Sequence, residues 1–166
     1  GIKVKDGMTM DEFVDLSKEI QKKTGMKTNI GYNHETLPEY WLRAKDQVFF
    51  EKGKLGAKSA EDINTIFTLE EQAIKEGWHV DPSVFTEITV GSAEQDPMVY
   101  GSNPESMSWC AFAYSNQLAA LQAAAPEGVE IGITTWPSDD LEKSNYLKPS
   151  QFFAVTTDCK NPEEAV

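Results

Sequence analysis

Signals for the beginning and end of helices constrain the fold of this chain more than any other feature of its sequence. Near the N-terminus, Thr9 is followed three residues later by Glu12, which is the pattern of a capping box. Gly25 lies where a glycine in the left-handed conformation ends many helices. Between these signals, apolar side chains recur at helical spacing at Phe13, Leu16 and Ile20. The pattern predicts an amphipathic helix over residues 10–24.

Similar signals predict further helices along the chain. A second helix is expected from about Pro38 to Lys52, with Gly53 as its end. Ser59 and Asp62 open a third helix, which ends before Gly77. Short helical pieces are expected around 82–88 and 92–100, and a longer helix over 112–125.

Strands are expected between these helices, at 27–32, 105–111, 129–135 and 151–157. The third of them alternates apolar and polar residues, as a half-buried strand does. Polar loops are expected at 33–36 and 138–149. Because helices and strands interleave, the fold class is α/β or mixed, rich in helix, with a small sheet flanked by helices. The 166 residues are about the length of one domain.

The charge balance limits the partners of the chain. It has 27 acidic and 15 basic residues, which gives a net charge of −12. An acidic protein repels nucleic acid phosphates and anionic lipid head groups, so neither is expected as a partner. The densest lysines lie at 18–27, alternate with acidic residues or lie at a helix end, and are typical of a solvated helix face.

Cysteines and histidines give little indication of a metal or a cofactor. Cys110 and Cys159 are the only cysteines, and they form no CxxC motif. Cys110 lies in an apolar run and is expected to be buried, while a disulfide with Cys159 depends on geometry. His79 and Asp81 are too few to predict a metal site. We therefore expect no cofactor.

The last six residues have the sequence of a beginning helix. Asn161 suits the N-cap, Pro162 the first helical position and Glu164 the capping carboxylate. One turn does not repay the cost of helix nucleation. We therefore expect the chain to be part of a longer protein.

Three stretches, in this order and spacing, resemble a known family. They are Asp6 to Gly25 (DGMTMDEFVDLSKEIQKKTG), Glu105 to Ala120 (ESMSWCAFAYSNQLAA) and Phe152 to Val166 (FFAVTTDCKNPEEAV). The first is similar to a T-W-D-E-F helix, except that Met10 stands where the family often has Trp. The last is similar to a K-N-P-E-x-A segment. Together they resemble the extracellular solute-binding proteins of bacterial ABC importers, in the sugar-binding family that includes maltose-binding protein.

The resemblance implies an architecture and a setting. Residues 1–166 would form one domain, most of the C-terminal lobe of a two-lobed periplasmic-binding-protein-like type II fold. Residues 151–166 would return toward the hinge. The partners would be a carbohydrate, the second lobe of the parent chain and the membrane permease of the importer. The parent would be an extracytoplasmic protein, periplasmic or anchored at the cell surface as a lipoprotein.

The resemblance also indicates where a sugar would bind. Such proteins stack aromatic rings on the apolar faces of sugars, while carboxylates and amides bind the hydroxyls. The candidate ligand-binding residues come from three places in the sequence: Glu35, Tyr40 and Trp41; Trp109, Phe112 and Tyr114; and Trp136. Each has an alternative. Trp41 and Trp109 could belong to the core, Glu35 could be a solvated loop residue, and Trp136 could cap the sheet.

No sequence motif indicates catalysis. The chain has no G-x-S-x-G, H-E-x-x-H, P-loop or G-x-G-x-x-G motif. Its acidic pairs lie in predicted helices or polar loops, and no spacing specifies the two carboxylates of a glycosidase. We therefore expect a binding protein and no enzyme. The alternatives are a protein–protein interaction module and, less favoured, a fragment of a glycan-active enzyme.

Overall fold

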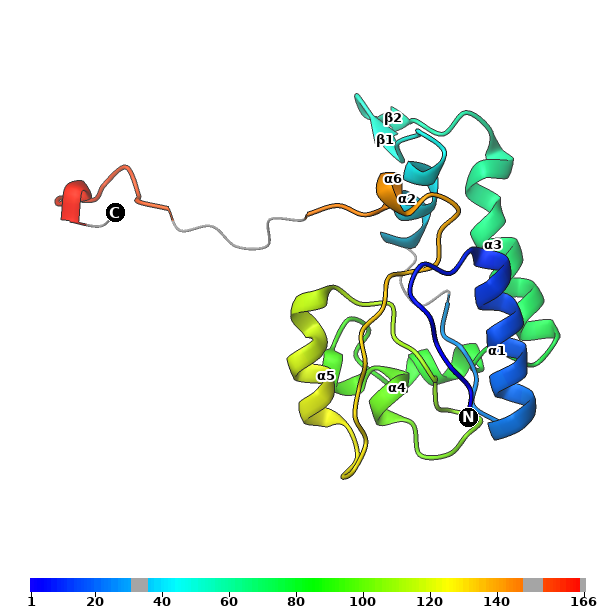
Figure 1. Cartoon of the computed structure of the whole chain (residues 1–166). Coiled ribbons are helices and arrows are strands. Elements are labelled where there is room, and N and C mark those ends of the chain that lie inside the picture. Colours follow the sequence, from blue (N-terminus) through cyan, green and yellow to red (C-terminus); the bar gives the residue numbers. More distant parts are fainter. Residues whose placement is uncertain (31–35, 148–153, 165–166) are drawn as a thin grey trace.

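The computed structural model describes residues 1–30, 36–147 and 154–164, and it shows a mixed, helix-rich protein with a small two-stranded sheet (Figure 1). The longest helices are α1 (Met10–Thr24), α2 (Thr36–Ala44) and α3 (Ala60–Lys75). Shorter helices are α4 (Pro97–Tyr100), α5 (Leu118–Ala124) and α6 (Leu141–Ser144). Single 3-10 turns are η1 (Pro82–Thr86), η2 (Ala93–Gln95), η3 (Ser115–Gln117) and η4 (Pro162–Glu164).

Local capping signals give the helices α1 and α3 the predicted bounds. The Thr9 hydroxyl accepts a hydrogen bond from the Glu12 backbone N–H, and the Glu12 carboxylate accepts one from the Thr9 N–H. Gly25 ends α1 in the left-handed conformation, at a φ of 79°. The Ser59 hydroxyl caps α3 in the same way, by accepting from the Asp62 N–H. Both predicted helices are confirmed.

The prediction of one helix over 38–52 is wrong in its second half. The helix α2 ends at Ala44, and Asp46 takes a left-handed φ of 53°. The chain then forms an antiparallel hairpin of β1 (Phe50–Glu51) and β2 (Lys54–Leu55). The two residues of its turn, Lys52 and Gly53, have φ values of 50° and 76°. A two-residue turn of this kind favours a hairpin, so Gly53 lies within the turn and does not end a helix.

The predicted strands at 27–32 and 105–111 are reduced to single bridges in the described residues. Lys27 forms a parallel bridge to Ser108, and Thr28 forms one to His79. Residues 27–28 therefore join two segments that are far apart in sequence. The Lys27 N–H donates to the Met107 carbonyl, and the Trp109 N–H donates to the Lys27 carbonyl. These bonds fix the position of the segment that carries Trp109.

Other predicted elements change in extent or kind. The helix expected over 112–125 begins only at η3 and α5, and residues 112–114 have no regular secondary structure. Residues 129–135 form an extended stretch beside α5 (Figure 1), but they belong to no ladder of described residues. The expected polar loop at 138–149 contains α6, which is capped by Asp140. Of the expected strand at 151–157, residues 151–153 lie outside the described residues, and 154–157 form no strand.

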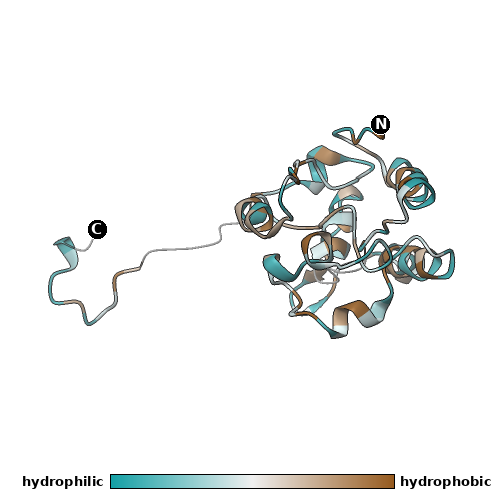
Figure 2. Ribbon diagram, turned by 90° about the horizontal axis from the view of Figure 1, so that it is seen from below, coloured by the Kyte–Doolittle hydropathy of each residue, from teal (hydrophilic) through white to brown (hydrophobic). Residues whose placement is uncertain are grey.

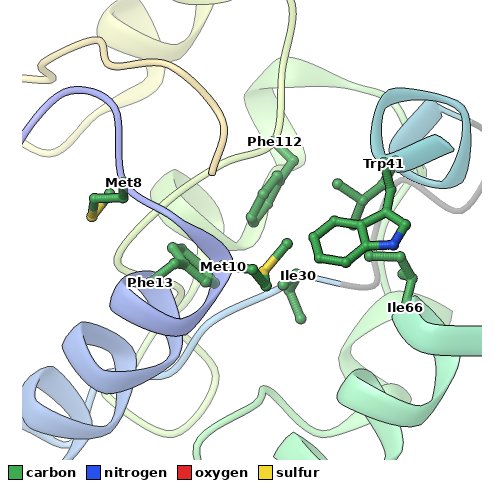
Figure 3. Close-up of a cluster of buried hydrophobic side chains, with 8 residues drawn as sticks. Met8, Met10, Phe13, Ile30, Trp41, Ile66 and Phe112 are labelled. Carbon is green, nitrogen blue, oxygen red and sulfur yellow. The ribbon is translucent and has the colours of Figure 1, made fainter. Parts of the chain in front are cut away.

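One hydrophobic core joins the N-terminal half to the later segments. It consists of buried side chains from α1, α2 and α3, from the segments that precede α1 and α2, and from the later segment that carries Phe112: Met8, Met10, Phe13, Ile30, Leu37, Trp41, Ile66 and Phe112. Figure 3 shows Trp41 beside Ile66 and Ile30, and Phe112 near Met10. Hydropathy colouring shows that hydrophobic and hydrophilic residues alternate along the helices (Figure 2), as amphipathic surface helices require.

Candidate functional site

The described residues form an open groove with a volume of about 1310 Å³. Its walls come mostly from residues 107–116, which lead into η3, and from residues 129–137. The N-terminal segment before α1 and residues 145–147 complete it. The groove therefore lies where four separate parts of the chain meet, which is typical of a ligand site.

Side chains, and not a β ladder, hold the segment 129–137 in place. The Gln122 amide donates to the Val129 carbonyl and accepts from the Ile131 N–H, at 2.9 and 2.8 Å. One side chain thus makes two backbone hydrogen bonds that a neighbouring strand would make in a sheet. Further along, the Thr134 hydroxyl donates to the Asp6 carboxylate at 2.7 Å. The segment is thus fixed between α5 and the N-terminal segment (Figure 1).

Aromatic rings follow one another along the wall of the groove. The Tyr40 and Phe112 rings each meet the Trp136 ring edge to face, with centroids 5.3 Å apart. Phe112 also meets Phe13 at 5.6 Å, and Phe13 meets Trp109 at 5.5 Å. The Phe13 and Trp109 rings are tilted by 34°, and the other three pairs are edge to face, which at these distances is favourable beyond the buried area. The rings of Trp109 and Trp136 are therefore held in fixed orientations while both remain partly exposed to the groove.

The Tyr40 hydroxyl connects α2 to the opposite wall. It donates a hydrogen bond of 2.9 Å to the Trp136 carbonyl oxygen. Burial raises the pKa of Tyr40 to about 12, because the phenolate would lose its hydration. Tyr40 thus stays a neutral donor at all physiological pH values and fixes the backbone that carries Trp136.

Two tyrosines, Tyr114 and Tyr146, form a second group of aromatic residues that line the groove. The hydroxyls of Tyr114 and Tyr146 are 3.2 Å apart, and the Tyr114 hydroxyl is 3.3 Å from Thr36 Oγ1. The Arg43 guanidinium lies 3.6 Å from the centre of the Tyr146 ring, a cation–π contact. Burial, followed by the hydrogen bond with Tyr114, raises the pKa of Tyr146. The two tyrosines place hydroxyl groups beside the apolar rings.

The structure brings most of the predicted site residues together. Five of them line the groove: Tyr40, Trp109, Phe112, Tyr114 and Trp136. Tyr40 and Phe112 are buried and support the wall, while Trp109, Tyr114 and Trp136 are partly exposed. Trp41 does not line the groove. It follows Tyr40 on α2 and so faces another direction, into the core against Ile66. Glu35 lies outside the described residues.

Sequence reasoning missed several polar groups of the groove. Asp6 lies just before the first predicted helix, Thr134 lies in a predicted strand, and Tyr146 lies in a predicted polar loop. An aromatic residue within a polar loop was the signal that could have indicated Tyr146. Asp6 and Thr134 face the groove only because two distant segments meet, and nothing local in the sequence indicates this.

Buried polar groups lie behind the wall that carries Cys110. The Cys110 thiol is 3.6 Å from Thr28 Oγ1 and 3.9 Å from Asn29 Oδ1. Burial raises the pKa of Cys110 to about 12, so its thiol stays protonated and is a poor nucleophile. Burial also raises the pKa of Asp96 to about 6. Both cysteines are free.

No metal centre is found among residues 1–30, 36–147 and 154–164, because no three His, Cys, Asp or Glu side chains in them converge. His79 is buried, and its Nδ1 is 2.7 Å from the Val80 carbonyl oxygen. This contact with the backbone is typical of a core histidine. In the same ranges, no helix has the length and apolar character needed to cross a membrane.

No protein-family model matches this sequence, and no curated protein or solved structure shows significant similarity to it.

Proposed function

We propose that the groove binds a carbohydrate, as part of an extracytoplasmic solute-binding protein that delivers sugar to an ABC importer. The observation that carries this proposal is the row of partly exposed aromatic rings, Trp109, Tyr114 and Trp136, along a single open groove. A sugar presents C–H groups on its ring faces and hydroxyls at its edges. Flat side chains that lose little entropy on binding suit the faces.

The charge of the groove favours a neutral ligand. Among the described residues that line it, none is a lysine or an arginine, whereas Asp6 and Glu130 carry carboxylates. Anionic ligands such as phosphates or carboxylic acids would therefore be repelled. Exposed carboxylates and the amide of Asn116 can instead accept or donate hydrogen bonds to sugar hydroxyls. These groups line the same groove as the rings, and a polyol with apolar faces requires both kinds of group.

The openness of the groove sets the affinity that we expect. In the proposed parent protein, a second lobe would close over the ligand, and the closed form would dock on the membrane permease. One lobe supplies only part of the contacts. If the two lobes together bind with about −8 kcal/mol, half of this energy corresponds to a dissociation constant near 1 mM. The chain alone should therefore bind sugars weakly.

The proposal is tested by titrating the protein with a panel of mono- and oligosaccharides and measuring binding by calorimetry or NMR. We expect at least one saccharide to bind at millimolar concentration, and Trp136→Ala to weaken its binding at least tenfold. Tyr100→Ala is the matched control, because Tyr100 is an exposed aromatic residue that does not line the groove. Circular dichroism verifies that both variants fold. The proposal fails if no saccharide binds at tens of millimolar, or if both variants weaken binding equally.

A second candidate function, a protein–protein interaction module, is favoured by one observation. The extended segment 129–135 exposes apolar side chains along the groove, with Val129 at 48% and Ile133 at 61% exposure. Extended peptides bind to such segments by adding a strand. In this case Ile133→Ser would abolish capture of a peptide ligand, whereas saccharide titrations would show no saturable binding.

A further inference from the structure

The hairpin of β1 and β2 exposes apolar side chains that nothing in the described structure covers. Phe50 and Leu55 are direct cross-strand partners, and their exposed fractions are 65% and 60%. Partners in register point to the same face of a hairpin, so these two side chains form one apolar surface. Val48 lies just before β1 and is 48% exposed. Most proteins bury such residues, and a group of them indicates an interaction surface.

The hairpin is a defined structure and not a frayed loop. The Gly56 N–H donates to the Phe49 carbonyl oxygen at 3.0 Å, which closes the base of the hairpin. A Cβ on Gly56 would lie only 2.7 Å from the Val48 carbonyl oxygen, so the two strands approach closely here. The Phe49 and Phe50 rings meet edge to face at 4.6 Å. The exposed apolar surface is therefore held in a fixed shape.

The charge of the hairpin is opposite to that of the rest of the chain. Residues 48–58 contain the three lysines Lys52, Lys54 and Lys58 and one acid, Glu51, so their net charge is 3 − 1 = +2. The whole chain carries −12, and the other residues therefore carry −14. The Lys52 side chain is 88% exposed, and Glu51 approaches it no closer than 4.0 Å. The hairpin segment is thus a locally basic part of an acidic molecule.

We propose that this hairpin docks on an anionic lipid surface. Its apolar side chains would enter the boundary between head groups and acyl chains, and the lysines of the same hairpin, Lys52 in the turn and Lys54 on the opposite face, would contact lipid phosphates. The hairpin lies at one edge of the molecule, away from α4 and α5 (Figure 1), so it can reach a surface that repels the acidic remainder. The sequence-based expectation against anionic lipid considered only the net charge of the whole chain.

Other occupants fit the hairpin less well. A nucleic acid would match the lysines, but it leaves Phe50 and Leu55 without an apolar partner. A second copy that paired hairpin against hairpin would bring Lys52 and Lys54 of both copies together. Each strand is also only two residues long, which gives little backbone for edge pairing.

The test is co-sedimentation with vesicles of phosphatidylcholine, with or without phosphatidylglycerol, at low ionic strength. We expect binding to the anionic vesicles, weaker binding to the neutral ones, and release by salt. Removing the charges of Lys52 and Lys54 by substitution with Gln should lower the partition coefficient roughly 25-fold, about fivefold for each lysine. The double variant Phe50→Ser, Leu55→Ser should lower it roughly tenfold or more.

Matched controls separate the hairpin from general surface effects. Lys3→Gln with Lys22→Gln removes two exposed lysines elsewhere, and Val90→Ser with Tyr100→Ser removes two comparably exposed hydrophobic side chains that do not line the groove. Both control variants should bind vesicles like the unmodified protein. The proposal is overturned if anionic and neutral vesicles bind equally, if controls and hairpin variants behave alike, or if light scattering shows a dimer that only the hairpin variants dissociate. None of these outcomes decides whether the groove binds a saccharide, so the two proposals are tested separately.

Discussion

Replacing Asp96 with asparagine should stabilise the folded protein at neutral pH, although Asp96 caps a helix. The carboxylate accepts a 2.9 Å hydrogen bond from the Met98 N–H at the beginning of α4. However, Asp96 is only 5% exposed, and burial raises its pKa to about 6. Asparagine offers the same acceptor oxygen without a charge to desolvate.

The size and sign of the effect follow from this pKa. The ordinary value is 3.8, so the shift is about two units, and each unit corresponds to about 1.4 kcal/mol. Between about pH 4 and pH 6, the folded protein binds more protons at Asp96 than the unfolded chain does. Its stability therefore falls as the pH rises through this window. Above pH 6 the free energy of unfolding is lower by the full amount, about 3 kcal/mol, and Asp96→Asn should restore this stability.

Asp81 provides the matched control for this prediction. It also precedes a proline and caps a helical turn, and its carboxylate accepts a 2.8 Å hydrogen bond from the Ser83 N–H. Asp81 is exposed, and hydrogen bonds from the Ser83 hydroxyl and N–H lower its pKa. Its contribution is therefore present above the ordinary pKa and is lost as the pH falls. Asp81→Asn should destabilise at neutral pH, opposite in sign to Asp96→Asn.

The assay is urea unfolding of the unmodified protein and both variants at about pH 4 and about pH 7.5. The stability of Asp96→Asn relative to the unmodified protein should be close to zero at the lower pH and about 3 kcal/mol higher at the upper one. A difference that is the same at both pH values would refute the reasoning. A loss of stability at neutral pH would show that the charge, and not its burial, dominates.

Three further predictions concern the capping box, the wall of the groove and the buried thiol. Thr9→Ala removes the cap of α1 and should cost about 1 kcal/mol in urea unfolding; no shift of the midpoint would contradict this role. Phe112→Ala should cost about 3 kcal/mol, at the low end for a buried ring because the adjacent groove lets the site relax; a cost below about 1 kcal/mol would contradict its place in the core. A thiol reagent near neutral pH should modify Cys159 and leave Cys110 unmodified until the protein unfolds, because the pKa of Cys110 is raised to about 12. Mass spectrometry of the folded protein locates the label, and a labelled Cys110 would contradict the prediction.

The sequence was sufficient for elements that their own residues specify. The helices α1 and α3 have caps within three residues of their first turn, and such local hydrogen bonds need no tertiary partner. The class of the fold, mixed and helix-rich with a small sheet, follows from the same signals.

Elements that depend on distant partners could not be predicted. Residues 129–135 alternate like a strand, but none of the described segments forms a ladder with them, and the Gln122 side chain instead binds their backbone. The hairpin was missed because Gly53 can end a helix as readily as it can form a turn. The left-handed conformation of the preceding residue, Lys52, distinguishes the hairpin turn from a helix end.

The candidate site was predicted only in part, because the direction of each side chain also depends on contacts with distant segments. Aromatic residues near the ends of extended segments were chosen on a family resemblance, and five of the seven residues line one groove. Which ring faces the groove depends on the packing around it. Tyr40 and Trp41 are neighbours in sequence, but one supports the groove and the other fills the core.

The tryptophans give the most direct test of carbohydrate binding in the groove. Trp109 and Trp136 line it, whereas Trp41 and Trp78 are buried away from it. The four indole N–H groups give separate signals in a ¹H–¹⁵N NMR spectrum, and single Trp→Phe variants assign them. On titration with a saccharide that binds, the signals of Trp109 and Trp136 should shift together and saturate, while those of Trp41 and Trp78 should stay in place. Unchanged signals of Trp109 and Trp136 at saturating ligand would contradict the proposed site.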